Sequence, residues 1–270
     1  MTARIFSSLL ALMLLVSFSP AVADTNGTLR VGMECGYAAF NWMQAEPGEY
    51  TVAIQGGGYA DGYDVQIARM IADALNMELV IVKTEWDGLP MAVQSGAIDA
   101  IIAGMSPTAK RRMTLDFTDH YYRSELVVVV RKDGAYANAS SLSDLSGAAI
   151  VAQLNTLHDT VVEQIPGVRH MMPMESFPAM VVALQAGAVD GYVAERPGAL
   201  ADVTANPDLT FIEFSEGQGF TASEDDTAIA IGLQIGSPLL EKINAALDGI
   251  DQAAREQLML DAIARQPLNN

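Results

Sequence analysis

Runs of apolar residues alternate along most of the chain with segments whose apolar positions recur every three to four residues. The segment 63–76 places apolar residues at Ile67, Ala68, Ile71 and Leu75, the spacing of one helix face. The same reading predicts strands at 29–33, 79–82, 100–103, 127–130, 149–152 and 192–194, and helices at 63–76, 89–93, 156–165, 176–186, 238–250 and 252–265. Strands and helices that alternate in this way predict an α/β fold with mainly parallel sheets.

Two stretches of the chain resemble each other. Residues 92–104 read AVQSGAIDAIIAG and residues 183–195 read ALQAGAVDGYVAE, with six identical positions of thirteen. Each stretch predicts a helix that ends at a glycine, then a turn and a buried strand. Two similar α/β lobes explain this repeat. Ligands of open α/β sheets bind beyond the carboxyl ends of the strands, so we expect Gly104-Met105-Ser106 of one lobe to face Glu195-Arg196 of the other.

The first 23 residues have the pattern of a secretory signal. Arg4 is their only charged residue, an apolar stretch covers 5–16, and Ala21-Val22-Ala23 has the form that signal peptidase reads. The apolar stretch is shorter than the roughly 20 residues that a membrane-spanning helix needs. We therefore expect export to the periplasm, cleavage after Ala23, and no direct insertion into the membrane.

Charge narrows the classes of partner. The formal net charge is −18 at pH 7, which disfavours nucleic acid and anionic lipid as partners. Such a surface would mildly attract cations, although a role in solubility or in a salty habitat is the simpler explanation. Cys35 is the only cysteine, and His120, His158 and His170 lack metal-ligand spacing. We expect no internal disulfide, no metal site and no cofactor.

The segment that follows Gly104 offers a binding site for an anion. Ser106 or Thr108 can cap a helix that starts near Ala109, and Arg111 on its first turn can donate two parallel hydrogen bonds to a carboxylate. A solvated basic face over 110–112 is the alternative. A basic residue is disfavoured at a helix N-terminus, so a bound anion gives the better explanation.

Acidic and aromatic residues follow two other predicted strands of the same lobe. Glu34 and Tyr37 come after the first strand, and Trp86 follows the strand at 79–82. A flat or cationic group could stack between the two aromatic rings, which is worth about 0.5–2 kcal/mol. Trp86 could instead belong to the core. One end of the cleft then suits a carboxylate and the other carries acids, a polarity that fits a zwitterion.

Three motifs make the sequence similar to the polar amino acid-binding family of periplasmic solute-binding proteins, family 3. Residues 104–122, GMSPTAKRRMTLDFTDHYY, follow the family pattern G-M-S-x-T-x-x-R and then D-F-[ST]-x-x-Y-Y. Gly62-Tyr63-Asp64-Val65 matches its glycine–aromatic–aspartate segment, and Trp86-Asp87-Gly88-Leu89 its aromatic-D-x-L segment. Together these motifs are specific, and the resemblance covers essentially the whole mature chain.

The resemblance implies a two-lobed type II fold with hinge crossings near 123–127 and 217–227. Lobe 1 would comprise 24–126 and 225–270, and lobe 2 would comprise 127–224. It also implies a monomer that closes on a free amino acid and delivers it to the permease of an ABC importer in the inner membrane.

Site roles are carried over from the family in the same way. Arg111 would hold the α-carboxylate with help from the backbone at Thr156. The Gly104 carbonyl, the Ser106 hydroxyl and Glu195 would receive the α-ammonium. The side-chain pocket would be lined by Glu34, Tyr37 and Trp86. The complete predicted ligand-binding set is Glu34, Tyr37, Trp86, Gly104, Met105, Ser106, Thr108, Arg111, Asn155, Thr156 and Glu195.

The chain departs from the family pattern at three places. Glu195 stands where the family usually has aspartate, which moves the carboxylate by about one bond length, about 1.5 Å. Asn155-Thr156-Leu157 replaces a glycine-threonine-threonine loop, so one hydroxyl contact is missing. Pro107 replaces a residue with a backbone donor. Each departure affects the geometry of the ligand rather than the class of protein.

Glu34 favours a basic ligand such as lysine, arginine, ornithine or histidine, because a buried carboxylate without a partner is costly. A neutral polar ligand such as glutamine also offers it donors. The alternative from another class is a periplasmic dehydratase acting on prephenate or arogenate on the same fold, with Glu195 as the acid. A receptor domain that signals through a separate membrane protein is the third reading.

Overall fold

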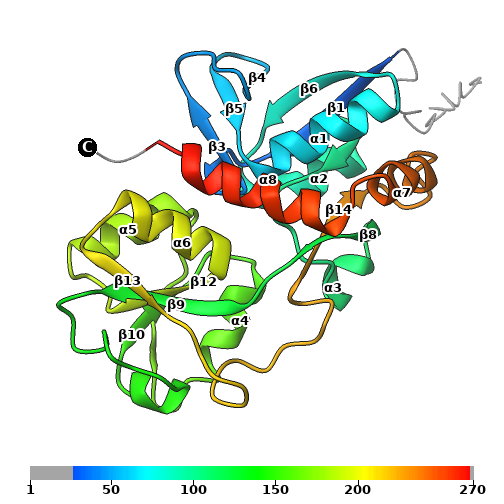
Figure 1. The fold of residues 1–270 in the computed structure, drawn as a ribbon. Coiled ribbons are helices and arrows are strands. Elements are labelled where there is room, and N and C mark those ends of the chain that lie inside the picture. The colour runs from blue at the N-terminus through cyan, green and yellow to red at the C-terminus, as the bar shows by residue number, and fades with distance from the viewer. Residues whose placement is uncertain (1–26, 268–270) are drawn as a thin grey trace, which may run out of the picture.

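Two α/β lobes, joined by two crossing segments, make up the part of the chain that the computed structural model describes, residues 27–267 (Figure 1). The predicted signal segment and its cleavage after Ala23 lie outside these residues. Within 27–267, no helix has the length and apolar character needed to cross a bilayer.

Lobe 1 is built on a five-stranded sheet in the order β6-β1-β7-β14-β8. The strands in this order are Glu78–Lys83, Thr28–Met33, Ala100–Ile101, Ala228–Leu233 and Asp116–Arg123. Its helices are α1 (Tyr63–Ala74), α2 (Leu89–Gln94), α3 (Ala109–Arg112), α7 (Leu240–Asp248) and α8 (Gln252–Arg265), with the single turn η1 (Trp86–Gly88) before α2. In Figure 1, α8 runs along the side of lobe 1 that faces lobe 2.

Lobe 2 repeats this arrangement in the order β11-β10-β12-β9-β13. The strands in this order are Arg169–His170, Ala149–Val151, Gly191–Glu195, Leu126–Arg131 and Leu209–Ile212. Its helices are α4 (Leu157–Val162), α5 (Phe177–Gln185) and α6 (Arg196–Ala205), with the short turn η2 (Leu142–Leu145). The two stretches that resemble each other in sequence form α2–β7 and α5–β12, and β7 and β12 each take third place in their sheet.

Both sheets are mixed rather than mainly parallel. In lobe 1, β1 pairs in parallel with β6 and β7, whereas β14 runs antiparallel to β7 and β8. In lobe 2, β10 pairs in parallel with β11 and β12, whereas β9 runs antiparallel to β12 and β13. The antiparallel strands β14 and β9 are the ones that enter their sheets directly from a crossing segment, so their direction is set by the path between lobes.

A small antiparallel sheet in lobe 1 is not predicted by the periodicity. It comprises β2 (Gly36–Tyr37), β3 (Asn41–Gln44), β5 (Tyr59–Asp61) and β4 (Val52–Ala53) in that order. These strands are shorter than or at the lower limit of the four to eight residues from which alternation can be read.

The crossing segments lie side by side. One is residues 124–125 between β8 and β9, and the other is residues 213–227 between β13 and β14. The amide of Ser124 donates a hydrogen bond to the carbonyl of Thr227 at 3.0 Å. The lobe boundaries at 126/127 and 224/225 stay a prediction. The first of them falls one residue inside β9.

A buried carboxylate in lobe 1 organises a hydrogen-bond network next to the loop after β7. Asp64, on the first turn of α1, is fully buried and accepts hydrogen bonds from Asn41 Nδ2 at 2.8 Å and Tyr121 Oη at 2.7 Å. The amide of Gly104 in turn donates to Tyr121 Oη at 3.3 Å. The network therefore ties β3, α1 and β8 to the loop after β7. Burial raises the pKa of Asp64 to about 6, against the lowering effect of these hydrogen bonds.

This shifted pKa predicts a pH-dependent stability. Because the pKa is raised from 3.8 to about 6 on folding, the folded state holds the proton more tightly, and the resulting stabilisation is lost as pH rises through that window. At about 1.4 kcal/mol for each pKa unit, the contribution is on the order of 3 kcal/mol. Asp64→Asn should remove this part of the pH dependence, measured as the free energy of unfolding in urea at pH 4.5, 5.5 and 6.5. Identical pH slopes for both proteins would contradict the role of Asp64.

Candidate functional site

The loop after β7 carries the guanidinium predicted to bind an anion. Thr108, rather than Ser106, caps α3: its side chain accepts from the amide of Arg111 at 3.3 Å. Arg111 Nη1 donates to the carbonyl of Ser106 at 2.8 Å, and Nη2 donates to the carbonyl of Asn155 in lobe 2 at 3.3 Å. Its Cζ lies 5.0 Å from the centre of the Trp86 ring. Burial lowers the pKa of Arg111 to about 10, against the opposing charge of Glu195, so it stays protonated at neutral pH.

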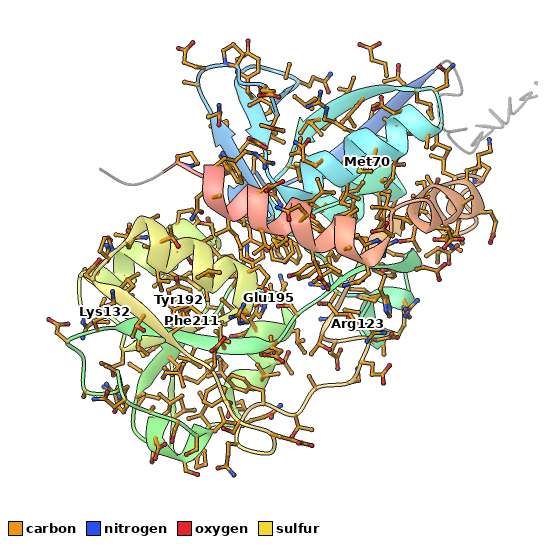
Figure 2. The ribbon with its side chains drawn as sticks, viewed as in Figure 1. Met70, Arg123, Lys132, Tyr192, Glu195 and Phe211 are labelled. Atoms are coloured by element: carbon orange, nitrogen blue, oxygen red, sulfur yellow. The ribbon has the colours of Figure 1, made fainter. Side chains whose placement is uncertain are left out.

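The carboxylate at the end of β12 has partners from both lobes. Glu195 is 3% exposed, and Figure 2 shows it where the two lobes meet. Tyr37 Oη from lobe 1 donates a hydrogen bond to Glu195 Oε2. His158 Nε2, from α4 of lobe 2, lies 2.9 Å from the same oxygen. Burial alone would raise the pKa of Glu195, but the contacts with His158 and Tyr37 bring the pKa below its ordinary value, so the group is ionised.

A second buried carboxylate lies at the end of β1. Glu34 Oε2 accepts a hydrogen bond at 2.9 Å from Gln153 Nε2, which belongs to lobe 2. Burial raises the pKa of Glu34, and the hydrogen bond from Gln153 opposes that shift only in part. The neighbouring Cys35 packs in the core, and burial raises the pKa of its thiol to about 12. It does not line the cavity and its thiol is inert at neutral pH.

One cavity between the lobes collects most of the predicted site. Its lining includes eight of the predicted residues: Glu34, Tyr37, Trp86, Gly104, Ser106, Arg111, Thr156 and Glu195. The cavity holds only about 10 Å³, about the space of one water molecule. An amino acid can therefore enter only if the lobes separate or the side chains that bridge them move.

The three other predicted residues lie elsewhere. Met105 points into the core, and its carbonyl accepts from the amide of Ala230 at 3.0 Å. Thr108 caps α3, and Asn155 donates to Asp87 Oδ1 at 3.0 Å across the lobes. These three residues line a neighbouring groove of about 770 Å³, which shares Trp86, Arg111, Thr156 and Leu157 with the cavity. The ligand roles of all the predicted residues stay predictions.

Sequence reasoning did not assign to the site five residues that line the cavity: Ala103, Gln153, Leu157, His158 and Phe177. Gln153 directly follows the predicted strand at 149–152, so its place beyond a strand's carboxyl end was a usable signal. The Phe177 ring stacks on that of Tyr37 with centroids 4.0 Å apart, and His158 meets Phe177 edge-on at 5.8 Å. No motif marks Phe177 or His158, because they reach the cavity through the packing of α4 and α5 within lobe 2.

Tyr37 enters a slot in lobe 2. Besides Phe177 and Glu195, the slot is formed by Gly198 on α6. A Cβ added to Gly198 would lie 2.6 Å from Tyr37 Cε2 and 2.9 Å from Tyr37 Oη. Real Cβ atoms essentially never approach other atoms so closely, so the ring fits only because residue 198 is a glycine. The same ring thus bridges the lobes and contacts the buried carboxylate.

The comparisons with known proteins agree with this arrangement. The family description that matches is bacterial extracellular solute-binding proteins, family 3, over residues 29–258. A probable histidine-binding protein of Campylobacter jejuni is 31% identical over 205 residues, which cover 75% of this chain and 74% of the relative. The L-cystine-binding protein TcyJ of Escherichia coli is 27% identical and covers 86% of this chain and 82% of its own.

Solved structures show the same two-lobed fold. An amino acid ABC transporter substrate-binding protein from Streptococcus pneumoniae, solved with L-arginine, superposes with a TM-score of 0.77 at 26% identity, covering 88% of this chain and 95% of that one. An ancestral arginine-binding protein bound to arginine gives 0.71 at 30% identity, covering 87% and 97%. The matching family and these relatives are binding proteins rather than enzymes, so the dehydratase alternative is not supported.

The slot around Tyr37 generates a test that needs no ligand. Gly198→Ala should force the Tyr37 ring out of lobe 2 and leave the lobes more open, while each lobe keeps its fold, since alanine favours a helix by about 1 kcal/mol over glycine. Small-angle X-ray scattering should then give a larger radius of gyration than for the wild type, with an unchanged far-UV circular dichroism spectrum. Gly48→Ala, where an added Cβ meets only ordinary contacts at 3.5 Å, is the control. Equal radii for all three proteins would refute the slot as a determinant of closure.

Proposed function

The chain belongs to family 3 of the bacterial extracellular solute-binding proteins, and on that premise we propose that it binds an L-amino acid between its lobes for delivery to an ABC importer. One observation carries the proposal: the guanidinium of Arg111 and the carboxylates of Glu195 and Glu34 line the same cavity. A molecule with one carboxylate and at least one ammonium group complements these charges.

Arg111 is the residue for the ligand's carboxylate. Its two terminal nitrogens now donate to the carbonyls of Ser106 and Asn155, one from each lobe. A carboxylate is a stronger acceptor than a carbonyl and can take two parallel hydrogen bonds from a guanidinium. The ring of Trp86 lies over the guanidinium and supports its orientation. We assign Trp86 this supporting role in addition to the predicted lining role.

Glu195 is the residue for the α-ammonium group, with the Gly104 carbonyl and the Ser106 hydroxyl beside it in the cavity lining. It is ionised and buried, and an ionic hydrogen bond is strongest where water is excluded. Because Tyr37 reaches it from the opposite lobe, closure and ligand binding act on the same carboxylate.

Glu34 selects the side chain of the ligand, and a basic one suits it best. Burial makes an unpaired negative charge costly there, and the distal cation of lysine, arginine or ornithine would compensate it. Arginine and histidine in the names of several relatives support the same choice. A neutral polar ligand such as glutamine is the second candidate. Glu34 already accepts a hydrogen bond from the side-chain amide of Gln153, and the side-chain amide of a bound glutamine could donate to it in the same way.

The remaining parts of the function follow the family. We propose that the protein is exported to the periplasm after cleavage behind Ala23, acts as a monomer, and presents its closed form to a permease in the inner membrane. The hinge would be the paired crossings 124–125 and 213–227.

Thermal unfolding of the mature protein tests this proposal. After removal of bound ligand by unfolding and refolding, the melting temperature is measured with each of the twenty amino acids, ornithine and cystine. A ligand at 100 times its Kd should stabilise the fold by about 2.7 kcal/mol. We expect the largest shifts with lysine, arginine or ornithine. Shifts with neutral amino acids alone would refute the basic ligand, and no shift with any compound would refute amino acid binding.

A substitution at Glu34 tests the selectivity separately. Glu34→Gln should weaken binding of L-arginine by roughly 10- to 100-fold, the scale of a hydrogen bond to a charged group, and change binding of L-glutamine much less. Isothermal titration calorimetry measures both. Glu85→Gln is the matched control, since Glu85 is a nearby carboxylate that is exposed and outside the cavity lining. Equal losses for the two ligands would show that Glu34 does not read the side chain.

A further inference from the structure

His158 is a buried histidine that the proposed function leaves without a role. It is 6% exposed, lines the cavity, and packs edge-on against Phe177. Its Nε2 lies 2.9 Å from Glu195 Oε2 at ion-pair distance, yet neither ring nitrogen has a well-aligned hydrogen bond within the described part of the chain. A buried imidazole with unpaired nitrogens beside a binding cavity calls for an explanation, because such groups are normally satisfied.

The contacts on Glu195 are divided unequally between its oxygens. Tyr37 Oη and His158 Nε2 both approach Oε2. A carboxylate can accept about four hydrogen bonds, two on each oxygen, so Oε1 is the oxygen that remains for a ligand. The two contacts come from opposite lobes and together fix the plane of the carboxylate.

The two ring nitrogens of His158 differ in what they can reach. Nδ1 is buried and has no acceptor among the described residues. Nε2 lies 2.9 Å from Glu195 Oε2, and a small rotation of the ring would align an Nε2–H with that oxygen. Nε2 is therefore the nitrogen through which His158 can act on Glu195.

We propose that His158 is a positioning residue of the binding site: it holds Oε2 of Glu195 so that Oε1 is presented to the α-ammonium group of the ligand. The inference rests on the proposed amino acid binding. It also gives the longer glutamate a physical role. Its extra methylene brings the carboxylate to the ring at the start of α4, and the ring then limits the additional freedom of the side chain.

The experiment measures L-arginine and L-glutamine binding by isothermal titration calorimetry with the full mature chain. The variants are His158→Phe, which keeps a ring against Phe177 but has no nitrogen, and His158→Gln, which keeps an N–H donor. Glu195→Gln and the double variant with His158→Phe complete a double-mutant cycle. His170→Phe is the control, because His170 contacts Asp159 and Glu163 at 2.7 Å and lies outside the cavity lining.

We expect His158→Phe to weaken binding about tenfold, the scale of one hydrogen bond to a charged group, and His158→Gln to retain most of the affinity. The double variant should bind within about twofold of Glu195→Gln, because His158 acts through that carboxylate. His170→Phe should bind as the wild type does.

Three results would overturn the inference. Unchanged binding by His158→Phe would show that the ring is inert. Losses that multiply in the double variant, or an equal loss in His158→Gln, would indicate a general effect on the fold rather than an action through Glu195. If the wild type binds neither these two nor any other amino acid, the proposed function fails and the inference fails with it. Circular dichroism of each variant establishes that the fold is retained.

Discussion

The buried negative charge of Glu195 is the constraint on which the closed arrangement depends. An ionised carboxylate that is almost fully removed from water costs several kcal/mol unless it is hydrogen-bonded or paired. Tyr37 from lobe 1 and His158 from lobe 2 supply the contacts. Because the tyrosine comes from the other lobe, this set of partners is complete only when the lobes are together. Bringing the lobes together therefore also completes the hydrogen bonding of Glu195. An ammonium group bound to the same carboxylate would further compensate its buried charge.

The repeated topology explains why this charge and the loop that carries Arg111 meet. The strands β7 and β12 take third place in sheets of equivalent order, and the residues at their carboxyl ends line the same cavity. Gly104 follows β7, and Glu195 ends β12. In lobe 1 two successive hydrogen bonds anchor the loop: the amide of Gly104 donates to Tyr121 Oη, and Tyr121 Oη donates to Asp64. The loop that carries Arg111 is thus anchored to the core of lobe 1.

The sequence allowed the lobes and their facing edges to be predicted, because the helix–turn–strand repeat at 92–104 and 183–195 is a local pattern that survives in the fold. It did not allow the small sheet at 36–61 to be predicted, since strands of two to four residues leave no readable alternation. The same limit applies to the site. Arg111 and Glu195 follow from strand ends, whereas Met105 turns into the core and Thr108 serves as a helix cap. His158 and Phe177 reach the cavity only through packing between elements far apart in the chain, which no single-sequence pattern encodes.

The charges in the cavity couple the net charge of the bound ligand to the protonation of Glu34. The carboxylates of Glu34 and Glu195, when both are ionised, together with the guanidinium of Arg111 leave one net negative charge on these three residues. A basic amino acid carries one net positive charge and would neutralise the closed cavity without any change in protonation. A neutral amino acid would leave the negative charge enclosed, and Glu34, whose pKa burial already raises, is the group that would take up a proton to remove it. Binding of a neutral ligand would then weaken as pH rises, whereas binding of a basic ligand would draw the proton away from Glu34 and strengthen with pH.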